Sequence, residues 1–120
     1  MVALYRDQGE TSRVVFTEFD DDEGLVICGV DTGKAALECW GNEDYEFWVT
    51  VKKEQIEKVI KALIKRNLKL KKPMMIKSSN KNRTLIALIK RFYKGHFSAV
   101  YDFMKFLKLH RIPYEFGFWN

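Results

Sequence analysis

The spacing of apolar residues changes once along this chain, near its middle, and that change constrains the fold more than any other feature. In residues 45–51, apolar side chains occupy every second position, the pattern of a β-strand with one buried face. From Ile56 onward, they recur three and four residues apart, on one face of a helix: Ile56, Val59, Ile60, Leu63 and Ile64. Strands followed by helices, without alternation between them, predict an α+β fold.

The first half contains short strand-like segments separated by clusters of turn residues. The segments are residues 13–19, 25–30, 36–40 and 45–51, and the clusters are residues 20–24, 31–34 and 41–44. Short strands joined by tight turns favour an antiparallel sheet. The triplet Asp31-Thr32-Gly33 matches the aspartic protease signature, but that family is almost wholly β. In this partly helical chain, the triplet predicts an ordinary turn.

Three helices are expected in the second half. The first extends from about Lys52 to Leu70, and Pro73 ends it. The second carries Leu85, Leu88, Ile89 and Phe92 on one face and is closed by Gly95, and the third carries Val100, Phe103, Met104 and Leu107. Residues 114–119 alternate again, and a terminal strand is poorly held unless it joins a sheet. We expect it to pair within the sheet, with the strand of Tyr45 as a candidate neighbour.

The chain is therefore predicted to be one α+β domain spanning residues 1–120. Its antiparallel sheet has four to five strands, about three helices pack on one face, and the last strand is C-terminal. No apolar run approaches the roughly 18 residues of a membrane span. Residues 1–13 have no apolar core of a secretory signal. We expect a cytoplasmic protein with free thiols and no membrane association.

Side chains suited to catalysis or metal binding are few and scattered. The soft metal ligands are Cys28, Cys39, His96 and His110. They show no Cys-x2-Cys or His-x3–5-His spacing. Residues 20–24 lack the glycine position of an EF-hand loop, and residues 29–34 have one residue too few between their glycines for a phosphate loop. We predict no metal, no cofactor and no enzymatic activity.

Charge divides the chain into an acidic half and a basic half. Residues 1–50 carry three basic and twelve acidic side chains, whereas residues 51–120 carry eighteen basic and four acidic ones. The net charge of +5 therefore hides halves of −9 and +14. Opposite charges either neutralise each other when the halves pack or leave two poles that attract oppositely charged partners.

The acidic turns and the aromatic residues near them form the predicted protein-binding surface. Trp48 alternates with Phe47 and Val49, so it points with Glu46 to the face that the helices are not expected to cover. The alternatives are that the acidic turn of residues 20–24 is simply solvated and that Trp48 packs under a loop. The predicted partner-binding residues are Asp20, Asp21, Asp22, Glu23, Trp40, Glu43, Asp44, Glu46 and Trp48. Acids around an aromatic anchor suit a basic protein partner.

Two segments of the chain also carry a family resemblance. They are residues 44–64, which open Asp44-Tyr45-Glu46-Phe47-Trp48 and continue into the amphipathic helix, and residues 97–119, which contain Ile112-Pro113-Tyr114-Glu115-Phe116. These segments resemble small bacterial proteins similar to immunity proteins of contact-dependent growth inhibition or other polymorphic toxin systems. The resemblance implies an inhibitor that neutralises a cognate toxin, such as a nuclease, by occluding its active site or substrate-binding surface. No binding residue is carried over, because such families diverge widely.

The basic half supports an alternative, a small nucleic-acid-binding domain. Its dense run of lysine and arginine could follow a phosphate backbone. The nucleic-acid-binding residues in this alternative are Lys65, Arg66, Lys69, Lys71 and Lys72. No RRM signature or helix-turn-helix spacing accompanies them.

Overall fold

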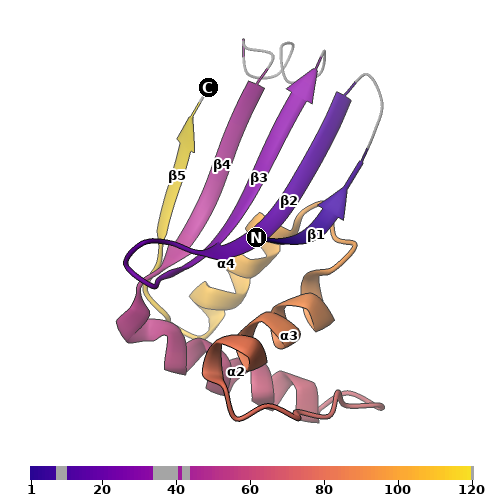
Figure 1. The fold of residues 1–120 in the computed structure, drawn as a ribbon, viewed down its shortest axis with the longest axis vertical. Helices are drawn as coiled ribbons and strands as arrows, with labels where there is room; N and C mark the ends of the chain where they lie inside the picture. The colour runs from indigo at the N-terminus through magenta and orange to yellow at the C-terminus, as the bar shows by residue number, and fades with distance from the viewer. Residues whose placement is uncertain (8–10, 34–40, 42–43, 120) are drawn as a thin grey trace.

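Five strands form one antiparallel sheet in the order β1-β2-β3-β4-β5 (Figure 1). The computed structural model describes residues 1–120 except 8–10, 34–40, 42–43 and 120. The strands are β1 Val2–Arg6, β2 Thr11–Phe19, β3 Leu25–Gly33, β4 Asp44–Val51 and β5 Glu115–Trp119. The C-terminal strand β5 pairs with β4, which confirms the predicted α+β fold and the predicted place of the last strand.

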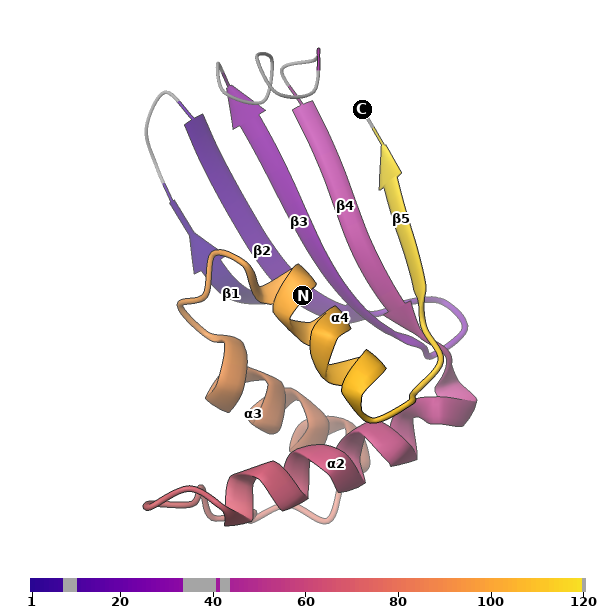
Figure 2. The same ribbon diagram turned by 180° about the vertical axis from the view of Figure 1, so that it is seen from behind.

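The helical segments all lie on one side of the sheet. They are the 3-10 turn η1 Lys53–Gln55 and the α-helices α2 Ile56–Leu68, α3 Lys81–Tyr93 and α4 Ala99–Leu109. Figure 2 shows α4 in front of the lower part of the sheet, with α2 and α3 below it. The opposite face, which Figure 1 presents to the viewer, is covered by none of these helices. We call the two sides the covered face and the open face.

The hydrophobic core fills the space between the covered face and the helices. Val15, Ile27 and Val49 from the sheet are fully buried. The helix positions that the three-and-four spacing predicted as buried meet them there. Leu63, Leu85, Leu88, Ile89, Phe103 and Leu107 are all fully buried. The predicted burial of these helix faces is confirmed.

Side chains and glycine set the ends of the helices. The Asn80 side chain accepts a hydrogen bond from the Arg83 N–H at the start of α3. Gly95, with φ of 83°, allows the chain to leave α3 in the left-handed region. The buried Asn67 amide bonds to both the N–H and the C=O of Met74, which holds the connection between α2 and α3.

The sequence-based prediction of the sheet was incomplete in the first half of the chain. The predicted turn at residues 31–34 is wrong for residues 31–33, because β3 continues through Gly33 and Asp31 pairs with Arg13 on β2. Lys34 lies outside the described residues. β1 was not predicted at all. The predicted strand at residues 36–40 lies outside the described residues.

Candidate partner-binding surface

The open face is apolar at its centre. The register aligns Phe16, Cys28, Trp48 and Gly117 in one row across four strands. Apolar side chains of the neighbouring rows flank this row. The apolar centre consists of Val14, Phe16, Val26, Val30 and Trp48, all half-buried, and the exposed Trp119. In a fold with helices on one side of the sheet, the uncovered face usually carries polar residues that contact water. A contiguous apolar region on that face instead indicates a surface that binds a partner.

The ring of Trp48 is in close contact with Gly117 of the neighbouring strand. A Cβ atom built on Gly117 would be 2.6 Å from two ring carbons of Trp48, far closer than real atoms pack. Glycine at this position therefore leaves room for the indole, and the indole shields the glycine backbone. Trp48 lies on the open face, as the alternation of β4 predicted.

Carboxylates lie around the apolar centre and, at Glu46, between two of its residues. Glu46 lies between Val30 and Trp119 in one row, and Glu18 and Glu115 occupy the two strands at the ends of another. Asp44 is exposed at the start of β4. The acidic rim is therefore Glu18, Asp44, Glu46 and Glu115. This arrangement places negative charge around an apolar surface that carries two tryptophans.

The structure does not bring all the predicted partner-binding residues together. The turn of residues 20–24 lies at the lower end of the sheet beside η1, whereas Asp44 begins β4 at the upper end (Figure 1). The length of β4 separates them, roughly 23 Å at 3.3 Å per residue. Trp40 and Glu43 lie outside the described residues.

Within the acidic turn, two of the four carboxylates have structural contacts. Asp20 Oδ1 accepts hydrogen bonds from the N–H groups of Asp22 and Gly24, at 3.0 and 2.8 Å. Glu23 has φ of 64° and forms an ion pair with Lys53, whose hydrogen bond lowers the pKa of Glu23. The turn thus joins the sheet to the first helical turn. Asp21 and Asp22 are exposed.

The residues of the nucleic-acid alternative surround the end of α2. Lys65, Lys69, Lys71 and Lys72 are exposed. Arg66 differs, because its guanidinium lies 4.3 Å from the ring centre of Phe92 and Nη1 donates to the Tyr93 hydroxyl. Arg66 therefore contributes packing between α2 and α3 as well as charge.

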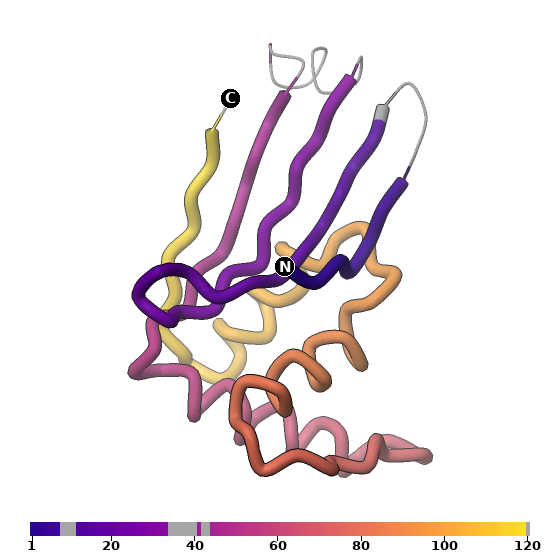
Figure 3. Tube along the Cα trace, in the orientation of Figure 1, coloured from indigo at the N-terminus to yellow at the C-terminus, as the bar shows by residue number. Residues whose placement is uncertain are grey.

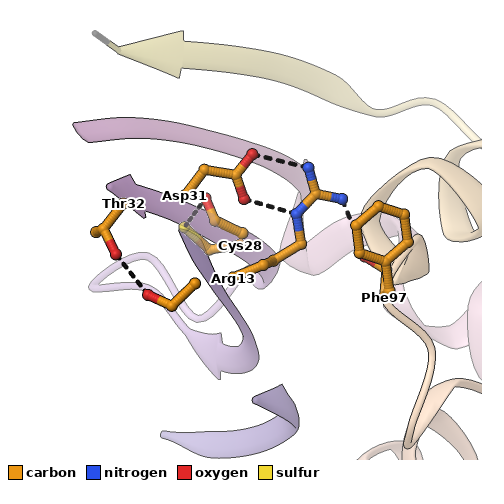
Figure 4. A network of polar contacts seen from close by, with 7 residues as sticks. Arg13, Cys28, Asp31, Thr32 and Phe97 are labelled. Atoms are coloured by element: carbon orange, nitrogen blue, oxygen red, sulfur yellow. Dashed lines mark hydrogen bonds and ion pairs between the residues drawn. The ribbon is translucent and has the colours of Figure 1, made fainter. Parts of the chain in front are cut away.

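A polar network on the covered face joins Arg13 to Asp31 and to Phe97 (Figure 4). Arg13 Nε and Nη2 donate to the two oxygens of Asp31 at 2.6 and 2.7 Å, and Nη1 donates to the Phe97 carbonyl. The guanidinium also lies 4.1 Å from the Phe97 ring centre. The hydrogen bonds that Arg13 donates to Asp31 raise the pKa of Arg13 above its usual value. Because this pair fixes β2, β3 and the α3–α4 connection together, we interpret it as structural.

The one described cysteine is poorly suited to nucleophilic chemistry. Cys28 is buried beneath the open face, between Phe16 and Trp48 in the register. Burial, with a smaller effect from Glu46, raises its pKa to about 12. A thiol with that pKa stays protonated near neutral pH, and the thiolate is the reactive form. Within the described residues, no three His, Cys, Asp or Glu side chains gather closely enough to hold a metal ion.

Comparisons with protein-family models, with curated proteins and with solved structures gave no match to this chain. Among the described helices, none has both the length and the apolar character required to cross a bilayer.

Proposed function

We propose that this chain is a non-enzymatic inhibitor of the immunity type, which binds a basic surface of a cognate toxin through the open face of its sheet. The observation that carries the proposal is the composition of that face. Trp48 and Trp119 lie in an apolar centre, and four carboxylates border it. Aromatic anchors inside a polar rim are the usual arrangement of residues that dominate binding energy.

The acidic rim supports a basic partner in particular. The whole chain carries +5, so long-range attraction of a cationic partner cannot come from the net charge. It must act locally, within a Debye length of about 8–10 Å. Among the described residues near the rim, Arg6 shares the open face and Lys52 pairs with Glu115 at 3.6 Å, so the four carboxylates outnumber these two cations. A nuclease cleft is such a partner, because it is basic in order to hold phosphates. Covering the cleft would exclude the nucleic acid in the cytoplasm.

The sheet provides a rigid platform for binding. Trp48 is on β4, which is hydrogen-bonded on both sides, and its ring is supported by Gly117. A side chain held in place before binding loses less entropy when the complex forms. The open face can therefore bind without large rearrangement.

The proposal is tested with the toxin domain encoded beside the gene of this chain. The chain should protect cells that express this domain, and the purified pair should form a complex. Glu46→Lys should weaken the complex about 10- to 100-fold, because it reverses a charge beside both tryptophans. Glu57→Lys is the matched control: it makes the same charge change at an exposed position of α2, away from the open face, and should leave affinity within about twofold. Equal losses for both variants would contradict binding through the open face.

The four exposed lysines around the end of α2 keep nucleic-acid binding as a second candidate. In this case, the chain should shift the fluorescence anisotropy of a labelled 20-nucleotide DNA or RNA, and the affinity should fall steeply with salt. The double variant Lys65→Glu/Lys69→Glu should abolish the signal, while Glu46→Lys should not. No binding in low salt would contradict this candidate.

A further inference from the structure

The two edges of the sheet are built differently. At the β1 edge, the register with β2 shifts between Ala3 and Tyr5, and the Leu4 carbonyl accepts a hydrogen bond from the Gly95 N–H at 2.7 Å. Figure 3 shows the α3–α4 connection passing beside β1. A bulge and a covering loop are two of the devices that prevent an edge from pairing with another chain.

The β5 edge has none of these devices within the described residues. Its register with β4 is regular from Glu115 to Trp119, and the strand contains no proline or lysine. Outside helices and strand pairs, no described backbone hydrogen bond reaches β5. Its large side chains are unusually exposed: Phe116 39%, Phe118 61% and Trp119 59%. A regular, apolar and uncovered edge is a template for another strand.

We propose that β5 pairs with β5 of a second copy, antiparallel and around a two-fold axis through Gly117, so that two sheets become one ten-stranded sheet. In this register, Gly117 faces its own copy, and Phe116 faces Phe118 of the second chain. Glu115 faces Trp119 of the second chain. The two phenylalanines of Glu-Phe-Gly-Phe-Trp lie at equal distances from Gly117, so a two-fold axis there pairs like aromatic residues with each other.

Each face of the joined sheet is compatible with this pairing. On the covered side, the four phenylalanines would meet beside rings that already contact them, since Tyr101 lies 6.2 Å from Phe116 and Tyr45 lies 6.2 Å from Phe118. Direct cross-strand aromatic pairs stabilise antiparallel sheets. On the open side, glycine at the axis has no side chain to obstruct approach. The two open faces would become continuous, independently of whether they bind a toxin.

The expected dimer is weak. A five-residue strand contacts its copy over less than the roughly 1,200 Å² of a standard stable interface, so a dissociation constant on the order of 10–100 μM is expected. Sedimentation equilibrium of the full chain from about 5 to 500 μM tests this directly. The apparent mass should rise from 14.2 kDa toward twice that value. A constant monomer mass over the whole range would overturn the proposal.

Single variants locate the interface. Phe118→Lys should weaken association at least tenfold, because it removes both of the symmetry-related Phe116–Phe118 pairs and adds a charge at the edge of each sheet. Met75→Lys is the control, since Met75 is 75% exposed on the α2–α3 connection. Circular dichroism and the thermal midpoint establish that both variants are folded. If Met75→Lys prevents association and Phe118→Lys does not, another surface joins the copies and the proposal fails.

A mixture of two variants tests the register itself. Phe118→Lys and Phe116→Glu should each be largely monomeric alone. When they are mixed at equal concentrations, the register through Gly117 places the introduced lysine opposite the introduced glutamate, so a mixed dimer should form. The mixture of Phe118→Lys with Phe118→Glu is the control, because those positions do not face each other. Equal recovery in both mixtures would rule out this register, and recovery in neither would do so as well.

Discussion

Adjacent residues of β4 each cover a glycine on a neighbouring strand, one on each face of the sheet. Phe47 lies over Gly29 of β3 on the covered face, and Trp48 lies over Gly117 of β5 on the open face. Both rings approach so closely that only glycine fits beneath them. Phe47 is 1% exposed and stacked on Tyr45 and Tyr101, at 5.7 and 5.4 Å. Trp48 is half-buried.

The comparison shows that the same contact, an aromatic ring packed on a glycine of the neighbouring strand, has a different role on each face. On the covered face, the ring is fixed from both sides, so the glycine contributes to core packing. On the open face, the same contact supports an aromatic side chain that still reaches solvent. The position of the helices therefore distinguishes a core residue from a candidate binding residue. Substitutions at the two pairs should reveal that difference in the free energy of unfolding.

The largest effect is expected at the covered pair. In Gly29→Ala, the new Cβ would lie 2.3 Å from Cζ of Phe47, a ring that is 1% exposed and stacked on Tyr45 and Tyr101. We expect the free energy of unfolding to fall by about 3 kcal/mol. Urea denaturation followed by circular dichroism measures it. A loss below about 1 kcal/mol would show that the covered face is less tightly packed than the structure indicates.

A smaller loss is expected from breaking the ion pair on the covered face. Arg13→Met removes both hydrogen bonds to Asp31, which would then be buried with its carboxylate uncompensated. Removing one partner of a fully buried pair costs about 3–5 kcal/mol, but these side chains are 15% and 10% exposed, so we expect about 2 kcal/mol. Arg13→Lys keeps the charge without the two-pronged geometry and should lose less. Equal losses in both variants would contradict the importance of that geometry.

The open pair should tolerate substitution better than the covered pair. In Gly117→Ala, the ring of Trp48 can swing outward, so we expect a loss of about 1 kcal/mol by the same urea measurement. The double variant Gly117→Ala/Trp48→Ala tests whether the loss comes from a clash with the Trp48 ring. Once that ring is removed, alanine at position 117 should hardly change the free energy of unfolding. A double-mutant cycle measures this coupling. If Gly117→Ala lowers the free energy of unfolding as much as Gly29→Ala does, the two faces are equally rigid, which contradicts the proposed difference between them.

Much of the fold could be predicted because apolar spacing reports burial directly. The alternation of β4 identified which face Trp48 occupies, and the helical spacing around Leu63 and Leu88 identified the core. Turn propensity failed at Asp31, because a residue that favours turns in isolation is held in β3 by Arg13, eighteen positions away. Local preference gives way to a tertiary ion pair there.

The candidate surface was less predictable, and for a different reason. Sequence analysis grouped the turn after Asp20 with Asp44 as one acidic pole. The predicted strand at residues 36–40 made residues 20–24 and 41–44 the first and third turns of a meander, which lie at the same end of a sheet. In the structure β4 pairs directly with β3, so the start of β4 lies at the opposite end from residues 20–24. The contact of Trp48 with Gly117 depends on how β5 aligns with β4, and nothing within either segment specifies that register. The chain half that contributes β5 is also otherwise basic and helical.

The smallest effect on stability is expected at the acidic rim. Glu46 is half-buried on the open face, where it pairs with Val30 and Trp119 on the neighbouring strands. Its side chain is therefore on the opposite face of the sheet from the buried core. Glu46→Lys should therefore change the free energy of unfolding by no more than about 0.5 kcal/mol, as surface substitutions usually do. The same variant should weaken toxin binding at least tenfold, which separates binding from folding at this residue. A loss of more than about 2 kcal/mol in urea would mean that Glu46 holds the sheet together, and the rim would then have to be explained by stability instead of recognition.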